Sequence, residues 1–131
     1  MFKKFVVATS LNTEMIDITS RVQEIVAGIK IDTGLCCVFI PHTTAGITIN
    51  ENADPAVRRD MLVELNKIVP QRDYFTHIEG NSAAHIKASL IGSSVTVPVE
   101  AGKLALGTWQ GIYFCEFDGP RAREVWVQIT G

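Results

Sequence analysis

Residues 123–130 carry the pattern that most limits how this chain can fold. Val125, Val127 and Ile129 alternate there with polar residues and with Trp126. Because neighbouring side chains of a strand point to opposite faces of a sheet, this alternation predicts a strand with one core-facing side. The other side carries Trp126, which we expect to contact another subunit or to cover a pocket.

The rest of the chain predicts both strands and helices. The other strands are expected at residues 2–9, 15–18, 35–40, 46–50, 94–99 and 108–116. Three helices are expected, beginning at Ser20, Asp54 and Asn81. A chain of 131 residues can bury one core but not two, so residues 1–131 are predicted to form a single α+β domain.

Each predicted helix has a start signal and an apolar face. Ser20 and Gln23 have the spacing of a capping box, and Asp54 stands as N-cap before a proline. Asn81 is the expected N-cap of the third helix, and Gly92 lies just past its end. The buried stripes are expected at Val22, Ile25, Val26 and Ile29, at Val57, Met61, Leu62 and Leu65, and at Ala83, Ile86 and Leu90.

Composition narrows the possible partners. The sequence is 47% hydrophobic and 20% charged, which is typical of a folded soluble domain. Its formal net charge is -2 and its basic residues form no run, so we expect neither a nucleic acid nor a membrane as its partner. No stretch reads as a signal peptide or as a membrane span, and the expected location is the cytoplasm.

The three cysteines have no spacing that suits a metal clip or a disulfide framework. Cys36 and Cys37 are adjacent on a predicted strand and would point to opposite faces. Together with Cys115 they are expected to be reduced thiols packed in strands. The strand 35–40 reads as buried on both faces, and burial disfavours a thiolate nucleophile.

The three histidines stand where packing alone explains them poorly. His42 lies between two predicted strands, His77 lies in a loop, and His85 lies at the edge of the third helix's apolar face. Three imidazoles that converge would supply the nitrogen shell of a divalent metal ion with open positions. The alternative is a hydrogen-bonded polar cluster at a subunit contact. Lys87, two residues after His85, is expected to point away to the surface.

Several polar motifs from residue 42 onward resemble those of the YjbQ-like family. They occur in the family's order at His42–Ala45, Asn50–Pro55, Asn81–Gly92, Gly107–Gln110 and Glu116–Arg121. The first 35 residues match only in general pattern. The family is also labelled secondary thiamine-phosphate synthase.

The resemblance implies a mixed β-sheet sandwich that carries about three helices and assembles as a homotrimer. It also implies a transferase activity like that of thiamine-phosphate synthase. That reaction joins an aminopyrimidine methyl diphosphate to a thiazole phosphate and releases pyrophosphate. It needs positive charge on the leaving group, for which a divalent metal ion, zinc or another, and an arginine are suited.

The matching motifs contain the candidate site residues, and each has a second reading. Glu51 is expected to act as an oxygen ligand, as a partner that orients a histidine or as a general base, or else to be a solvated loop carboxylate. Arg121 is expected to clamp a phosphate, or else to form an ion pair with Asp118 or Glu116.

The remaining candidates are expected to bind the substrate or an anion. Thr43 and Thr44 have hydroxyls that either bind an anion or satisfy the loop backbone. Trp109 and Gln110 either stack on a pyrimidine and hydrogen-bond its edge, or belong to the core or an interface. Asn50 and Asp118 complete the set. None of the common nucleotide-binding or hydrolase signatures occurs in the sequence.

Three functions are consistent with these residues. The first is a metal-dependent enzyme acting on a small phosphorylated or heterocyclic molecule, with His42, His77 and His85 as metal ligands. The second is a trimer that binds a small anion without chemistry. In the third, the metal is structural and closes a subunit contact. The first function is favoured because a structural metal site would not need the additional polar groups of Glu51 and Arg121.

Overall fold

The computed structural model describes residues 1–72 and 75–131 and confirms the α+β class. Within those residues the chain forms eight strands and three helices. The strands are β1 Phe2–Ala8, β2 Glu14–Asp17, β3 Gly34–Phe39, β4 Ala45–Glu51, β5 Ser94–Glu100, β6 Lys103–Leu104, β7 Gln110–Glu116 and β8 Ala122–Thr130. The helices are α1 Thr19–Ile29, α2 Pro55–Ile68 and α3 Ser82–Ile91.

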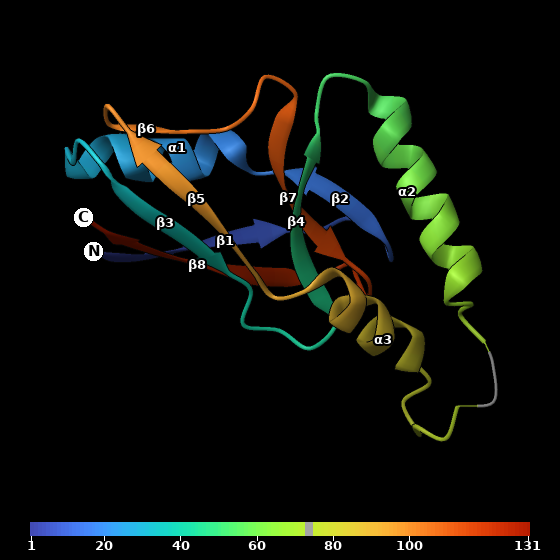
Figure 1. Cartoon of the computed structure of the whole chain (residues 1–131). Helices are drawn as coiled ribbons and strands as arrows, with labels where there is room; N and C mark the ends of the chain where they lie inside the picture. Colours follow the sequence, from blue (N-terminus) through green and yellow to red (C-terminus); the bar gives the residue numbers. More distant parts are fainter. Residues whose placement is uncertain (73–74) are drawn as a thin grey trace.

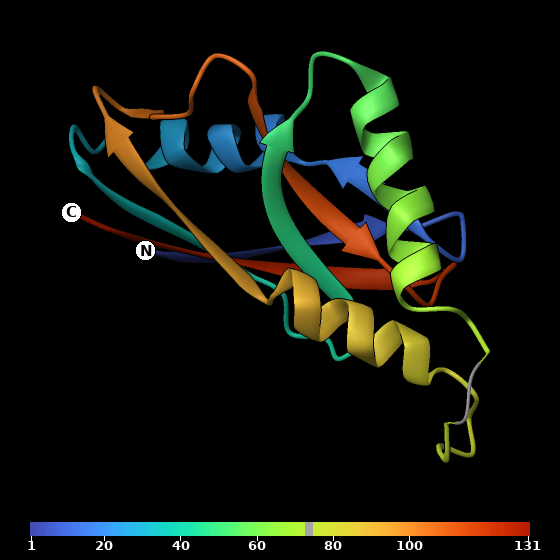
Figure 2. The same cartoon turned by 45° about the vertical axis from the view of Figure 1, so that its right-hand side comes forward.

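The strands form two sheets in which the described pairs are antiparallel. One sheet has five strands in the order β1-β8-β3-β5-β6, and the other has three in the order β2-β7-β4. Figures 1 and 2 show α1 and the three-stranded sheet on one side of the larger sheet, and α2 and α3 beyond the smaller sheet. The main core lies between the sheets and under α1.

The alternation in β8 is confirmed. Val125 and Val127 are fully buried, whereas the intervening positions lie on the outer face of the larger sheet. The neighbouring strand β3 is buried on the same side only. Leu35 and Phe39 are 53% and 39% exposed, so the prediction that both faces of this strand are buried was wrong. No helix covers this outer face in the part of the chain that the structure describes.

Helix α1 has the predicted apolar face but a different start. Val22 and Val26 are fully buried in the core. The predicted capping box does not form, because the Asp17 carboxylate accepts hydrogen bonds from the Thr19 amide and hydroxyl. Gln23 instead accepts a hydrogen bond from the Leu104 amide. Its side chain therefore joins the helix to the edge of the larger sheet rather than capping the helix.

Helix α2 begins as the sequence predicts. Asp54 is the N-cap and accepts a hydrogen bond from the Ala56 amide, and Pro55 is the first helical residue. Met61, Leu62 and Leu65 pack against the outer face of the smaller sheet, although no residue of α2 is fully buried. Helix α2 is thus a partial cover over this sheet.

Helix α3 buries a different face from the predicted one. Ala83, Ala84, Lys87 and Ala88 are buried, whereas Ile86 and Leu90 are 38% and 60% exposed. Small side chains face the sheet because α3 lies close to β4, and that gap excludes larger ones. The prediction that Lys87 is at the surface was also wrong. Its ammonium group donates to Asn66 on α2, and burial lowers the pKa of Lys87.

The close approach of α3 to β4 depends on Gly46. A Cβ atom there would lie 2.7 Å from the Gly92 carbonyl oxygen, which already accepts a hydrogen bond from the Ile47 amide. We expect Gly46→Ala to push the end of α3 away and to lower the free energy of unfolding by about 1–3 kcal/mol. Urea titration measures this loss. Gly28→Ala is the control, because a Cβ at Gly28 has nothing within 4 Å; an equal effect of both changes would contradict this account.

No helix of residues 1–72 and 75–131 is long and apolar enough to cross a membrane.

Candidate functional site

All three histidines line one pocket at the end of the smaller sheet. The pocket has a volume of about 420 Å³ and is open to solvent. His42 comes from the loop between β3 and β4, His77 from the segment before α3, and His85 from α3 itself. Arg121 and Arg123 form part of the same wall. The fold thus places residues from three separate parts of the sequence on the wall of one pocket.

His42 is held in one orientation by the backbone. Its Nε2 atom accepts a hydrogen bond of 2.8 Å from the Glu124 amide at the start of β8. Burial and the nearby positive charge of Arg123 lower the pKa of His42, which favours the neutral ring. A ring whose Nε2 accepts a hydrogen bond carries its proton on Nδ1. His42 therefore presents an N–H donor rather than a free lone pair.

His77 and His85 form a pair. Their ring centroids are 5.4 Å apart and the rings are perpendicular. Two imidazoles on one tetrahedral metal ion have centroids about 5 Å apart, since the metal–nitrogen bond is about 2.0 Å. The spacing of the pair is compatible with two positions of a metal shell, which also requires that one nitrogen of each ring point to the same place.

His42 does not fit a third position in this arrangement, because its lone pair is used by the Glu124 amide. Among residues 1–72 and 75–131, no three His, Cys, Asp or Glu side chains are close enough to hold one metal ion. The predicted shell of His42, His77 and His85 is untested, and the contact of His42 with the Glu124 amide favours a site that uses only His77 and His85. Measuring the metal content of the wild type and of His42→Ala tests it.

Arg121 forms an ion pair with Asp118. Its Nη2 atom lies 3.0 Å from the Asp118 carboxylate, and its Nε–H group donates to the Asp118 carbonyl oxygen. Asn81 also donates to this carboxylate, at 2.9 Å, instead of capping α3 with its side chain. The Asp118 carboxylate therefore holds Arg121 at the pocket wall. About half of the Arg121 side chain remains exposed.

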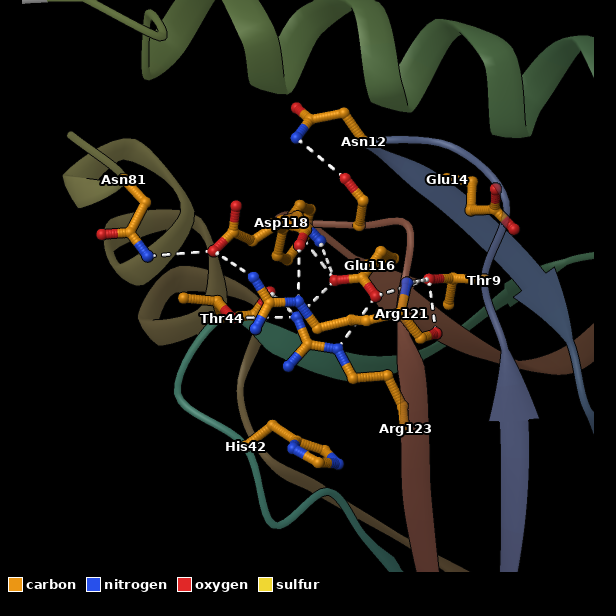
Figure 3. Close-up of polar contacts among 12 residues, drawn as sticks. Thr9, Asn12, Glu14, His42, Thr44, Asn81, Glu116, Asp118, Arg121 and Arg123 are labelled. Carbon is orange, nitrogen blue, oxygen red and sulfur yellow. Dashed lines mark hydrogen bonds and ion pairs between the residues drawn. The ribbon is translucent and has the colours of Figure 1, made fainter. Parts of the chain in front are cut away.

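The sequence reasoning missed a buried ion pair behind this wall. Arg123 is 4% exposed and donates through Nε and Nη2 to Glu116, which is fully buried (Figure 3). Thr44 accepts from the same Nη2 atom with its hydroxyl and carbonyl oxygens, and Thr9 donates to Glu116. The alternation of β8 could have predicted that Arg123 is buried, because it lies two residues before the buried Val125 and so points to the same face.

Thr44 and Thr43 have different surroundings. The Thr44 hydroxyl is buried and accepts a hydrogen bond from the Arg123 side chain, a partner that is neither an anion nor the loop backbone. Thr43 is exposed and lines the histidine pocket. Thr44 also lines the pocket, but its hydroxyl already accepts from Arg123, so Thr43 is the better candidate to contact a ligand.

The state of Glu116 predicts how stability depends on pH. Burial raises the pKa of Glu116, but hydrogen bonds from Arg123, Asp118 and Thr9 outweigh this effect, so the net pKa lies below the ordinary value of 4.5. A lowered pKa in the folded state gives stability that is present above pH 4.5 and lost as pH falls through the folded value.

We therefore expect the wild type to keep this contribution above about pH 5 and to lose it in more acidic buffer. Thermal unfolding from pH 3 to 7 measures the effect. In Glu116→Gln this part of the pH dependence should be missing. A Glu116→Gln curve parallel to that of the wild type would contradict the assignment.

Another group of predicted residues lies at the opposite end of β4. Ala45, near the histidines, pairs with Glu116, whereas Glu51 pairs with Gln110 at the far end of the same two strands. Seven extended residues span roughly 20 Å. Glu51 and Gln110 are therefore remote from the histidine pocket within one chain.

Local contacts define this second group. The Asn50 side chain accepts a hydrogen bond from the Glu51 amide, and Gln110 accepts one from the Gly107 amide. Tyr113 donates its hydroxyl to the Glu51 carbonyl oxygen. Trp109 is 62% exposed, so it is not a core residue. The structure separates these candidates from the histidines of the same chain.

The cysteines take no part in the pocket. All three are free thiols, and burial raises the pKa of Cys36 to about 11 and that of Cys115 to about 12. Such thiols are protonated at neutral pH and are poor nucleophiles.

The protein is an α+β domain of two packed antiparallel sheets and three helices. Its candidate small-molecule site is the pocket lined by histidines and arginines. The family model described as UPF0047 protein YjbQ-like matches residues 3–131, and the chain belongs to this family. The UPF0047 protein of Methanocaldococcus jannaschii is 50% identical over 131 residues, which covers 100% of this chain and 95% of that protein. The UPF0047 protein YugU of Bacillus subtilis is also 50% identical, over the full length of both.

Solved structures confirm the fold. The crystal structure of a YjbQ/UPF0047 family protein from Clostridium acetobutylicum is 56% identical, with a TM-score of 0.96 over 98% of this chain and 99% of that one. A protein of unknown function from Sulfolobus solfataricus has the same TM-score at 36% identity, over 100% of this chain and 96% of that one. The resemblance noted in the sequence motifs therefore extends over the whole domain.

Proposed function

We propose that this protein is a small-molecule transferase that binds a phosphorylated substrate in the histidine pocket. The observation that carries the proposal is the convergence of three histidines and two arginines on one space of about 420 Å³. That volume suits a small ligand, and the wall supplies both fixed positive charge and hydrogen-bond donors.

The reaction we propose is the condensation that the family label suggests. A ring nitrogen of the thiazole phosphate forms a bond to the methylene carbon of the aminopyrimidine, and the carbon–oxygen bond to the diphosphate breaks. The pyrophosphate leaves with the electron pair of that bond. Arg121 is placed to stabilise the charge that develops on it, because Asp118 fixes its guanidinium at the pocket wall.

A divalent metal ion is the proposed cofactor, held by His77 and His85. When bound, it would add positive charge next to the diphosphate. The residues of this chain perform the other tasks. His42, whose Nε2 accepts from the Glu124 amide, would donate to the substrate from Nδ1, Thr43 would contribute its hydroxyl, and Asp118 orients Arg121.

We also propose that the protein acts as a homotrimer in the cytoplasm. The outer face of the larger sheet exposes apolar side chains, including Phe2 at 47%, Leu35 at 53% and Phe39 at 39%, and such a surface favours association. A second chain would also explain why Glu51 and Trp109 lie far from the histidines of their own chain. The free thiols are typical of a reducing compartment.

Turnover of the wild type tests the proposal directly. Purified protein without a polyhistidine tag is incubated with the aminopyrimidine diphosphate, the thiazole phosphate and one divalent ion at a time. We expect thiamine phosphate and pyrophosphate in equal amounts. Absence of product with every ion tried, from protein that is folded, would contradict the enzyme. In that case binding of the same compounds without product would favour the second function, an anion-binding protein.

Subunit mixing tests whether two chains build one site. We propose that Glu51 of one chain acts as general base at the histidine pocket of a neighbouring chain. His85→Ala and Glu51→Gln should then each lose activity alone, and mixed trimers should contain some sites that have both residues. We expect partial recovery of activity on mixing and a mass in solution three times the 14.4 kDa of one chain. A monomer by analytical ultracentrifugation would contradict the trimer. Full activity of Glu51→Gln would remove Glu51 from the chemistry.

A further inference from the structure

Arg123 is buried but not fully satisfied. Its Nε and Nη2 atoms donate to Glu116 and Thr44, which accounts for one edge of the guanidinium. The remaining nitrogen, Nη1, donates no hydrogen bond to any residue in 1–72 or 75–131. The side chain is only 4% exposed and lines the pocket, so Nη1 is the part of the guanidinium left to face that space.

The ring of His42 lies on the unused side of this guanidinium. Figure 3 shows the Arg123 guanidinium between the Glu116 carboxylate and the His42 ring. The Glu124 amide occupies Nε2 of His42, so the ring offers Nδ1–H as its only donor. Arg121 has the same arrangement as Arg123, because Asp118 occupies its Nε and Nη2 atoms and leaves Nη1 without a partner among the described residues.

Donors of this kind suit a tetrahedral oxyanion. Two guanidinium edges and one imidazole N–H supply hydrogen-bond donors from three residues, and the fixed positive charges match an anion with several acceptor oxygens. Glu116 binds the guanidinium of Arg123, and Asp118 binds that of Arg121. The arginines are therefore positioned before the ligand arrives, which reduces the entropy lost on binding.

We propose that Arg123, together with Arg121 and Nδ1–H of His42, forms the subsite that binds a phosphate group in this pocket. This role rests on the proposed function and adds Arg123 and a donor role for His42. The ligand class is a phosphate monoester or a diphosphate. Glu116 is a positioning residue, because it touches Arg123 and not the ligand space.

Calorimetric titration with inorganic pyrophosphate, and separately with inorganic phosphate, tests the subsite. Arg123→Lys keeps a positive charge beside Glu116 but removes Nη1, and we expect it to weaken pyrophosphate binding about tenfold or more. Arg59→Lys is the matched control, since Arg59 is exposed on α2 and lines a different pocket. Its affinity should equal that of the wild type.

Equal affinities of the wild type and a folded Arg123→Lys would overturn the inference. If Arg123→Lys does not fold, the inference is tested by the NMR signals of the His42 ring nitrogens in ¹⁵N-labelled wild type. We expect protonated Nδ1, bare Nε2, and a shift of the Nδ1 signal when pyrophosphate is added. The opposite tautomer, or an unchanged signal at saturating pyrophosphate, would also overturn it.

The outcome is separable from the test of the enzyme. If the wild type turns over substrate but Arg123→Lys binds pyrophosphate normally, the subsite is contradicted and the transferase proposal stands. If pyrophosphate binding depends on Arg123 but the wild type has no turnover, the transferase proposal is contradicted and the subsite stands.

Discussion

Arg123→Ala is expected to lower the free energy of unfolding by roughly 3–5 kcal/mol, because it leaves the Glu116 carboxylate buried without its counter-ion. Glu116 is fully buried, and two of its hydrogen bonds come from Arg123. For a domain of this size the melting temperature should fall by roughly 10 °C or more. Chemical denaturation followed by circular dichroism measures the loss.

The double variant Arg123→Met with Glu116→Gln separates charge from packing. It removes both charges and fills similar volume, so we expect it to lose less stability than Arg123→Ala alone. If the single variant is within about 0.5 kcal/mol of the wild type, the pair does not stabilise the fold as described. A double variant less stable than the single one would also conflict with this reading.

His85→Ala is expected to lower the rate of thiamine-phosphate formation at least about 100-fold. The His85 ring lines the pocket and packs against His77, so its loss removes one of the two nitrogens proposed to hold the metal ion. The measurement is the initial rate at saturating substrates. Leu90→Ala is the control, because Leu90 is 60% exposed on the same helix. A His85→Ala enzyme with more than half of the wild-type rate would exclude this role.

Much of the fold could be predicted from the sequence because local patterns agreed with the packing. The alternation in β8, the apolar face of α1 and the N-cap of α2 at Asp54 are examples. Helix α3 shows the limit. Hydropathy favours Ile86 and Leu90 as its buried face, but the contact with β4 at Gly46 leaves room only for alanines and for the stem of Lys87. Such a distance between elements is not contained in a local pattern.

The candidate site was predicted in part. The sequence predicted one site for the three histidines, and all three line one pocket, but no three His, Cys, Asp or Glu side chains of residues 1–72 and 75–131 are close enough to share a metal ion. The tautomer of His42 could not be predicted, because it depends on an amide 82 residues away in the sequence. The role of Arg123 depends on the same kind of contact, with Thr44 at a separation of 79 residues. Glu51 was expected within reach of the histidines, but β4 separates them in one chain.

The most direct test of the central claim is a crystal structure of the wild type with inorganic pyrophosphate. We predict pyrophosphate in the histidine pocket, with oxygens within hydrogen-bond distance of Arg121, Arg123 and Nδ1 of His42. A second pocket, lined by Arg58 and Arg59 beside α2, offers a competing basic surface. Pyrophosphate bound only there, or at neither place in a crystal soaked at saturating concentration, would contradict the account.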